Sequence, residues 1–332
     1  MTTTEPACPR RTPFSFELYP PKTLDGGLAL ARTVEHLAAA GPEFISVTFG
    51  AGGSSRTASL DVLRSIRTST SVDPMAHLTC VGSTHAQASR LIKDFLDAGV
   101  HSFLALRGDP PAGAVEGDAF LGDLGSAAEL VQLIGRVSAE HEPYAEGSLV
   151  GLPGAVQLGR RHRPRIAVAA FPNGHPRSRS TTQDLDTLLA KQAAGATLAI
   201  TQLFFHADDY LAFAERARRH GVTMPILPGV MPITSPARLR RVLELSGEAL
   251  PSDLAIALEV EPDEAGRIDI GTDYSARLIR DVVAGGAPGV HLYAFNQHRT
   301  VLDVLHRAGI PVHDDRPVRH PIPDPLTSKD AR

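Results

Sequence analysis

The sequence is poor in cysteine: Cys8 and Cys80 are the only two among its 332 residues. A disulfide framework needs several cysteines, and a structural zinc site needs cysteine and histidine at short, regular spacing. Neither pattern occurs, and no Ser/His/Asp arrangement typical of a hydrolase stands out. We therefore expect a chain without a metal site, in which other side chains carry any chemistry.

An excess of charge and a long apolar run are also missing. The formal net charge is −4, which predicts no strong attraction to nucleic acid or to an anionic membrane. No stretch reaches the roughly 18 apolar residues that span a bilayer, and the N-terminus lacks the apolar core of a signal peptide. The sequence thus predicts a soluble, cytoplasmic protein with no nucleic-acid or membrane partner.

Short apolar runs alternate with amphipathic stretches along nearly the whole chain, a pattern typical of parallel α/β folds. The predicted strands are Phe14–Leu18, Phe44–Phe49, Met75–Cys80, Ser102–Leu106, Ile166–Ala170, Leu198–Leu203, Pro225–Val230 and Val290–Phe295. The clearest predicted helices are Leu28–Ala40, Ala86–Ala98, Asp184–Ala194 and Ala207–His220. Several helices end on a glycine suited to a left-handed cap: Gly41, Gly99, Gly195 and Gly221.

Eight strands, mostly spaced by about 30 residues, predict a single (β/α)8 TIM barrel. The alternative is a doubly wound open sheet. It is disfavoured because no Gly-x-Gly-x-x-Gly follows the first strand, where a dinucleotide-binding fold needs it. The run that begins at Gly50 is too short and wrongly spaced for that fingerprint.

The predicted domain organisation has three parts. Residues 1–12 form a flexible N-terminus, residues 13–310 form the barrel, and residues 311–332 form a proline-rich tail. An excursion at about 141–165 lengthens the connection before the fifth strand. A second irregular region, Gly247–Gly271, carries extra helix-like sequence before the last strand.

Polar side chains stand at or just after the ends of most predicted strands. They are Glu17, Thr48, His77, Thr79, Arg107, Asp109, His175, Gln202, Asn296 and Gln297. Taken singly, each is more often a rim residue, a helix cap or a hydrogen-bonded core side chain. Taken together, they predict a binding mouth for a polar, planar ligand, since barrels keep their chemistry at this end.

Two carboxylates in this set come from strands that are not adjacent. Glu17 follows Phe16 and precedes Leu18 and Tyr19, so we expect a desolvated acid with a raised pKa. Asp109 ends the segment Arg107-Gly-Asp after the fourth strand. Carboxyl groups in unlike environments can take different protonation states, one acting as an acid and the other as a charged anchor.

These residues belong to motifs that resemble the 5,10-methylenetetrahydrofolate reductase family, of the bacterial type with the catalytic barrel alone. The matching segments begin at Phe16 (Phe-Glu-Leu-Tyr-Pro-Pro-Lys-Thr), Phe44 (Phe-Ile-Ser-Val-Thr-Phe-Gly-Ala), His77 (His-Leu-Thr-Cys), Leu106 (Leu-Arg-Gly-Asp), His175 (His-Pro), Gly195 (Gly-Ala-Thr-Leu-Ala-Ile-Thr-Gln-Leu-Phe-Phe) and Pro228 (Pro-Gly-Val-Met-Pro). They occur in order from residue 14 to about residue 308.

The resemblance implies reduction of 5,10-methylenetetrahydrofolate to 5-methyltetrahydrofolate by NAD(P)H, with NADH favoured. Glu17 is expected to protonate N10 and open the five-membered ring, Asp109 to contact the pterin and steady the cation, and Gln202 to orient the pterin. Gln297 is expected among the substrate-binding residues. The positions that match the family's FAD contacts are Thr48, His77, Arg107, Gly108, Asp109, His175, Asp184 and Lys191. A homo-oligomer is a further expectation.

The chain departs from the family pattern around the flavin. The departures are Phe49, Ser126, Phe171, Asn173, Thr187, Pro236 and Gln297, where the family has other polar or aromatic residues. Each loses a hydrogen bond or stacking contact of about 0.5–1.5 kcal/mol. Two routes for the hydride therefore stand side by side: a bound FAD as shuttle, or weak FAD binding with direct transfer from NAD(P)H.

Two other functions compete with this one. The first is a different barrel flavin-linked oxidoreductase, which gives no reason for the motif around Glu17. The second is a non-catalytic folate-binding barrel, which needs no acid for ring opening.

Overall fold

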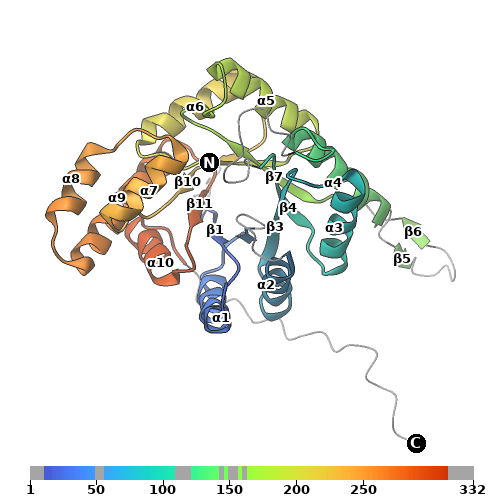
Figure 1. The fold of residues 1–332 in the computed structure, drawn as a ribbon, viewed down its shortest axis with the longest axis horizontal. Helices are drawn as coiled ribbons and strands as arrows, with labels where there is room; N and C mark the ends of the chain where they lie inside the picture. The colour runs from blue at the N-terminus through green and yellow to red at the C-terminus, as the bar shows by residue number, and fades with distance from the viewer. Residues whose placement is uncertain are drawn as a thin grey trace, which may run out of the picture.

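Parallel strands alternate with helices along the chain and close into a ring with the helices outside it (Figure 1). The structure is a computed structural model that describes residues 11–48, 56–108, 121–141, 146–148, 156–158 and 163–312. The sheet order is β10-β11-β1-β2-β3-β4-β7-β8-β9. The strands are β1 (Phe14–Leu18), β2 (Phe44–Val47), β3 (Asp73–Thr79), β4 (Ser102–Leu106), β7 (Arg165–Ala170), β8 (Leu198–Thr201), β9 (Ile226–Leu227), β10 (Gly229–Val230) and β11 (Val290–Tyr293).

The ring closes through one interrupted strand, which the sequence predicted as a continuous Pro225–Val230. Pro228 separates β9 from β10, because proline has no N–H to donate to the ladder. β9 pairs with β8, β10 pairs with β11, and the Pro228 carbonyl accepts a hydrogen bond of 2.9 Å from His291 N. The sheet has nine strand segments, and β9 and β10 are the two halves of one strand. The ring therefore has eight strands, and the predicted (β/α)8 barrel is confirmed.

The helices cover the outside of the ring in the order of the chain (Figure 1). They are α1 (Leu24–Ala39), α2 (Arg56–Ser69), α3 (His85–Asp97), α4 (Ala127–His141), α5 (Thr181–Ala193), α6 (Ala207–Arg219), α7 (Pro236–Ser246), α8 (Ser252–Val260), α9 (Glu264–Ala284) and α10 (His298–Arg307). The four predicted helices are confirmed, and the four predicted cap glycines have φ between 75° and 116°. α1 begins four residues before the predicted Leu28, because the Thr23 side chain caps it by accepting from Gly26 N.

Several strands end earlier than the sequence predicts, which leaves their polar residues in the connections. β8 ends at Thr201, and the Gln202 side chain turns back to accept a 2.9 Å hydrogen bond from Leu203 N. β11 ends at Tyr293, because Phe295 and Asn296 have positive φ values of 47° and 58°. The alternation of apolar and polar residues along a strand does not indicate where the strand ends.

Apolar side chains fill two spaces, one outside the ring and one within it. Phe14, Phe16 and Leu18 belong to the large cluster between strands and helices. Because successive side chains of a strand point to opposite faces, Ser15 and Glu17 point into the ring. The smaller interior cluster contains Phe44, Met75, Leu104, Ala167, Leu198, Ile200 and Leu227. Polar residues of β1, β3 and β11 thus share the barrel interior with an apolar plug.

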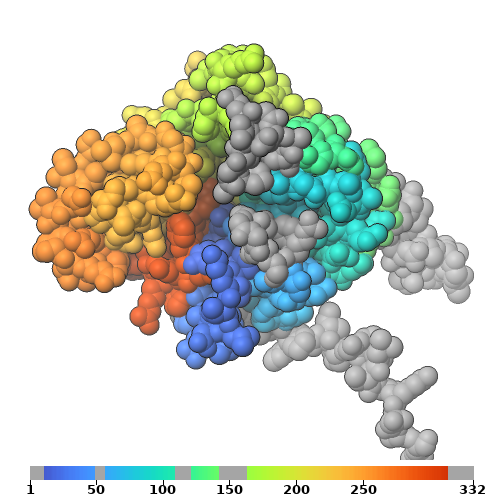
Figure 2. All heavy atoms as spheres, viewed as in Figure 1, coloured from blue at the N-terminus to red at the C-terminus, as the bar shows by residue number. Residues whose placement is uncertain are grey.

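Two additions lie outside the ring. The predicted excursion holds an antiparallel pair, β5 (Glu146–Ser148) with β6 (Val156–Leu158), which projects beyond α4 in Figure 1. Helices α7, α8 and α9 form a bulge on the other side (Figure 2), packed over a third apolar cluster. Among the described residues, no helix combines the length and apolar content that crossing a bilayer requires.

The two predicted terminal segments lie almost wholly outside the described residues. Arg11 is described, and its guanidinium donates to the carbonyls of Ala40 and Pro311 at 3.0 Å.

Candidate active site

Glu17 lies inside the ring between two histidines. Its Oε2 is 3.5 Å from Nε2 of His77 on β3 and 3.8 Å from Nε2 of His291 on β11. The Glu17 side chain is 20% exposed, whereas those of His77 and His291 are 6% and 0% exposed. The carboxyl group is therefore the part of this trio that a ligand can reach.

Neighbouring side chains contact the His291 ring and one of its nitrogens. Nδ1 of His291 lies 2.8 Å from Oγ of Ser15. The ring stacks on Phe44 with a centroid separation of 5.7 Å and meets the edge of Tyr293 at 5.4 Å. The parallel register of β1 with β11, which pairs Ser15 with His291 and Glu17 with Tyr293, brings these groups together.

The electrostatics of Glu17 differ from the sequence-based expectation. Burial favours the neutral acid, but the neighbouring His77 and His291 act in the opposite direction and outweigh it, so the pKa of Glu17 is lowered. The predicted raised pKa is therefore wrong, because two histidines from other strands face the carboxyl. Burial also lowers the pKa of His77, and the Glu17 carboxylate only partly opposes this.

A clamp from the last connection holds the segment that follows Glu17. The Asn296 side chain accepts from Tyr19 N at 3.1 Å and donates to Tyr19 O at 2.9 Å. Thr33 of α1 donates to the Asn296 carbonyl at 3.2 Å. The left-handed backbone of Phe295 and Asn296 makes this approach possible, and asparagine tolerates that conformation better than most residues. Strain of this kind gathers at functional sites.

The end of β4 brings Arg107 and Gly108 to the mouth, beside the end of β3. Arg107 O accepts from Cys80 N at 3.2 Å. Gly108 has a φ of 86°, and a Cβ atom there would lie 2.5 Å from Cγ2 of Val81. Glycine is thus required by both conformation and space. Asp109, which the sequence analysis expects to contact the pterin, lies outside the described residues.

Two cations, Arg107 and Lys191, influence each other electrostatically near the ends of β4 and β7. Lys191 on α5 is 9% exposed, and its Nζ donates to the Ala169 carbonyl at 2.8 Å. Burial lowers its pKa to about 8; Asp184 opposes this shift, and the positive charge of Arg107 adds to it. Two cations that repel each other inside a partly buried site are suited to an anion such as a pyrophosphate.

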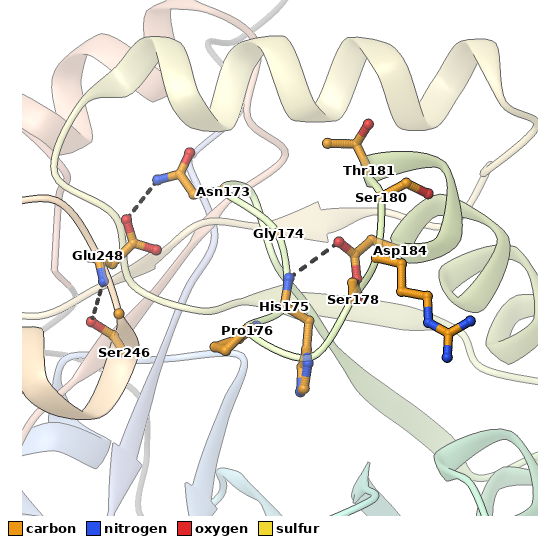
Figure 3. Close-up of a pocket in the computed structure, with 12 residues that line it drawn as sticks. Asn173, Gly174, His175, Pro176, Ser178, Ser180, Thr181, Asp184, Ser246 and Glu248 are labelled. Atoms are coloured by element: carbon orange, nitrogen blue, oxygen red, sulfur yellow. Dashed lines mark hydrogen bonds between the residues drawn. The ribbon is translucent and has the colours of Figure 1, made fainter.

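A pocket of about 300 Å³ opens between the connection after β7 and the connection from α7 to α8. In Figure 3 the Asp184 carboxylate is directed at the backbone of His175, and the Asn173 amide is directed at Glu248. Asp184 accepts from His175 N at 3.2 Å and also from the Ser178 hydroxyl. Burial raises the pKa of Glu248, which the Asn173 hydrogen bond opposes and Asp209 reinforces. The polar groups of this pocket thus already have partners within the chain.

The remaining predicted residues are more scattered. Thr48 follows β2, where its N donates to Leu18 O and its carbonyl accepts from Ser59. Gln202 is half-buried, and Gln297 is exposed at the start of α10. Among the described residues, no hydrogen bond links either glutamine to Glu17, so their roles stay predictions.

Most residues that depart from the family pattern have local structural partners. The Ser126 hydroxyl accepts from Glu129 N and donates to the Glu129 carboxylate. Thr187 donates to the Gln183 carbonyl of its own helix at 2.7 Å. The Phe171 ring meets the His175 ring edge-on at 4.7 Å, and Pro236 begins α7. Phe49 lies outside the described residues.

The sequence analysis missed Ser15, His291 and Tyr293. Each lies within an apolar strand, two positions from another polar residue, so Ser15 and Glu17 share one face and His291 and Tyr293 share another. The spacing of two residues was the signal in the sequence that could have identified them. It shows only that the two polar residues of each strand point to the same face. Packing of β1 beside β11 decides that the two faces meet.

Comparisons with known proteins agree on one family. The family model described as methylenetetrahydrofolate reductase matches residues 5–309. A probable methylenetetrahydrofolate reductase (NADH) of Oryza sativa subsp. japonica is 31% identical over 92% of this chain, which spans 50% of that protein. The 5,10-methylenetetrahydrofolate reductase of Salmonella typhimurium is 28% identical over 89% of this chain and 90% of that protein. The chain thus spans about half the length of the plant relatives it matches.

One solved structure shares the fold at low identity. It is an uncharacterized protein from Clostridium thermocellum, described as binding two copies of 5-methyl-5,6,7,8-tetrahydrofolic acid. The TM-score is 0.56 and the identity 12%, over 90% of this chain and 94% of that one. This likeness shows the barrel alone.

Proposed function

The chain belongs to the methylenetetrahydrofolate reductase family, and from this premise we propose that it reduces 5,10-methylenetetrahydrofolate to 5-methyltetrahydrofolate. The observation that carries the proposal is the carboxyl group of Glu17, reachable inside the ring and faced by two buried histidines. NAD(P)H is the proposed reductant, and NADH is favoured because the plant relatives are named for it. A cytoplasmic location and a homo-oligomer stay predictions.

The reaction consumes one proton and one hydride. Glu17 gives a proton to N10, the bond between N10 and the bridging carbon breaks, and the five-membered ring opens. The hydride from the nicotinamide is then added to the bridging carbon of the 5-iminium cation. Atoms and charge balance, because the oxidised nicotinamide leaves with the positive charge that the cation loses.

Glu17 must hold a proton to start this sequence, although its pKa lies below the ordinary value. A bound folate would cover the exposed fifth of its side chain and remove the water that solvates the carboxylate. Desolvation of this kind favours the protonated form. We infer that Glu17 takes up its proton as the folate binds.

The residues near the ends of β4 and β7 fit a dinucleotide in part. Lys191 and Arg107 offer cations for a pyrophosphate. FAD, when bound there, would supply a carrier for the hydride between nicotinamide and folate. Asp184 matches a flavin contact, but Ser178 and His175 already donate to it, so a flavin hydroxyl has to share the carboxylate with them. We infer that FAD binds weakly, and direct transfer from NADH is the alternative.

A non-catalytic folate-binding barrel is the second candidate function. It gives no reason for a carboxyl group enclosed by two histidines, since binding alone needs no proton donor. Another flavin-linked barrel oxidoreductase is disfavoured by the family match over residues 5–309.

The deciding experiment is an absorbance spectrum of the purified chain, followed by NADH oxidation with 5,10-methylenetetrahydrofolate. We expect 5-methyltetrahydrofolate to form in equal amount to the NADH consumed, with less than one flavin per chain. Assays with and without added FAD separate the two routes. Tightly bound stoichiometric flavin, with activity proportional to it, would contradict weak FAD binding. Folate binding without NADH oxidation would favour the non-catalytic barrel.

A further inference from the structure

A chain of buried polar groups leads from Glu17 through His291 to Ser15. Nε2 of His291 lies 3.8 Å from Oε2 of Glu17, and Nδ1 of the same ring lies 2.8 Å from Oγ of Ser15. Ser15 and His291 are fully buried. Polar side chains at such depth are costly unless they are paired. Packing alone does not explain why two of them stand behind the carboxyl group.

The tautomer of His291 is linked to the direction of its hydrogen bond with Ser15. The Ser15 hydroxyl has one hydrogen and two acceptors in reach, Nδ1 of His291 at 2.8 Å and the Val290 carbonyl at 3.4 Å. We take the hydroxyl to donate along the shorter contact, to Nδ1. A neutral imidazole that accepts at Nδ1 carries its hydrogen on Nε2. That hydrogen is on the nitrogen that faces Glu17.

Two aromatic side chains pack against the His291 ring. Phe44 stacks on it, with 21° between the planes, and Tyr293 packs against it at 86°. Among the described residues, no hydrogen bond is formed at Nε2 of His291. The donor is therefore available to Glu17 when the carboxyl group moves a fraction of an ångström.

We propose that His291, held by Ser15, is a positioning residue that makes Glu17 release its proton more readily. The proposal rests on the proposed role of Glu17 as the acid. An N–H donor beside a carboxyl oxygen favours the carboxylate over the acid. It thus stabilises the state that forms as Glu17 protonates N10.

Other groups face Glu17 from the strands around it. His77 on β3 approaches the same oxygen and is largely neutral near pH 7, because burial lowers its pKa. Tyr293 on β11 donates its hydroxyl to the Thr201 carbonyl at 2.8 Å, so it offers Glu17 no hydrogen. Ser46 on β2 is paired with Glu17 in register, and its hydroxyl donates to the Phe16 carbonyl. His291 has a buried partner, Ser15, at its second nitrogen.

The first test compares the pH dependence of kcat in His291→Leu and His291→Gln. Activity needs protonated Glu17, so kcat falls as pH rises through the pKa of Glu17 in the complex. Loss of the donor in His291→Leu raises that pKa, so the alkaline limb moves to higher pH while kcat at its plateau falls about tenfold. His291→Gln keeps an N–H donor near the same place and should return both quantities toward the wild type.

Ser15→Ala provides a milder variant, with Ser46→Ala as its matched control. Both serines are fully buried and lie on adjacent strands, but Ser46 donates to a backbone carbonyl. Ser15→Ala frees His291 to take the other tautomer. The alkaline limb of the kcat profile should therefore move to higher pH, but by less than in His291→Leu. An unmoved limb in both His291→Leu and Ser15→Ala overturns the proposal, and so does an equal movement in Ser46→Ala.

Infrared difference spectra test the same point without turnover. Glu17→Gln identifies the carbonyl band of the protonated Glu17 side chain, and a pH titration of that band gives its protonation directly. In His291→Leu the band should persist to higher pH than in the wild type. If the wild type fails to reduce the folate, the proposed function fails, whereas an unchanged titration in His291→Leu refutes the role of His291 alone.

Discussion

The two halves of the barrel mouth differ in how their side chains are held. On one side, Glu17, His77 and His291 stand on strands and point into the ring, where the parallel register fixes their separation. On the other side, Arg107 follows a strand, and Asp184 and Lys191 lie on α5. We call these the acid half and the cation half.

The hydrogen-bonded register of the strands fixes the geometry of the acid half. In the cation half, side chains form hydrogen bonds with residues close to them in the sequence. Asp184 accepts from Ser178 and His175, and Thr187 donates to its own helix. Each such bond competes with a ligand, since a group with a partner gains less from a new one. The comparison teaches that the chemistry resides in the strands, while affinity for the dinucleotide is set by residues free to vary.

The strongest way to break this comparison is Glu17→Gln. Gln keeps the shape but has no acidic proton, so we expect kcat for folate reduction to fall at least about 100-fold. Binding of NADH, followed by its fluorescence, should change little. Glu35→Gln, at an exposed position on α1, is the matched control. Full activity in Glu17→Gln would remove Glu17 from the mechanism.

A change in the cation half should act on affinity instead. Lys191→Met removes a buried cation, so Kd for NADH, and for FAD where it binds, should rise roughly 10- to 100-fold. Flavin or nicotinamide fluorescence measures this. The infrared titration of Glu17 should stay as in the wild type. Lys93→Met, exposed on α3, serves as the control. A shifted Glu17 titration in Lys191→Met would show that the two halves are not independent.

The pH dependence of binding sharpens the same distinction. Lys191 has a pKa of about 8, so it is charged below that pH and loses its proton above it. A bound anion raises the pKa of Lys191, so Kd for the dinucleotide should increase by about tenfold per pH unit just above pH 8. Titrations between pH 7 and pH 9.5 measure this, and the increase should disappear in Lys191→Met. A Kd that stays constant in the wild type would mean that Lys191 does not contact the anion.

The smallest expected effect concerns the partner of Asp184. Ser178→Ala removes a hydroxyl that occupies its carboxylate, so FAD affinity should rise a fewfold. Flavin fluorescence quenching measures the affinity. Thr68→Ala on α2 is the control, because it also removes a hydroxyl, but one that donates to a backbone carbonyl away from Asp184. Weaker FAD binding in Ser178→Ala would show that Ser178 supports the site instead of competing for it.

Much of the fold could be predicted because its signals are local. Apolar runs gave the strands, helical spacing gave the helices, and cap glycines such as Gly99 gave their ends. The break of one strand at Pro228 was missed, since a proline at a strand position can also lie at its edge. Motifs around Glu17 and Arg107 marked the mouth, but the raised pKa was wrong because its cause lies on other strands.

The sequence by itself determined the barrel, the family and the position of Glu17, because each follows from the order of residues along the chain. Tertiary structure alone decided what surrounds Glu17. His77 and His291 are 60 and 274 residues away from it, and only the closing of the ring brings their Nε2 atoms to one oxygen. A carboxyl group's proton affinity depends on the charges and donors within a few ångströms, and spacing along a sequence does not fix those distances.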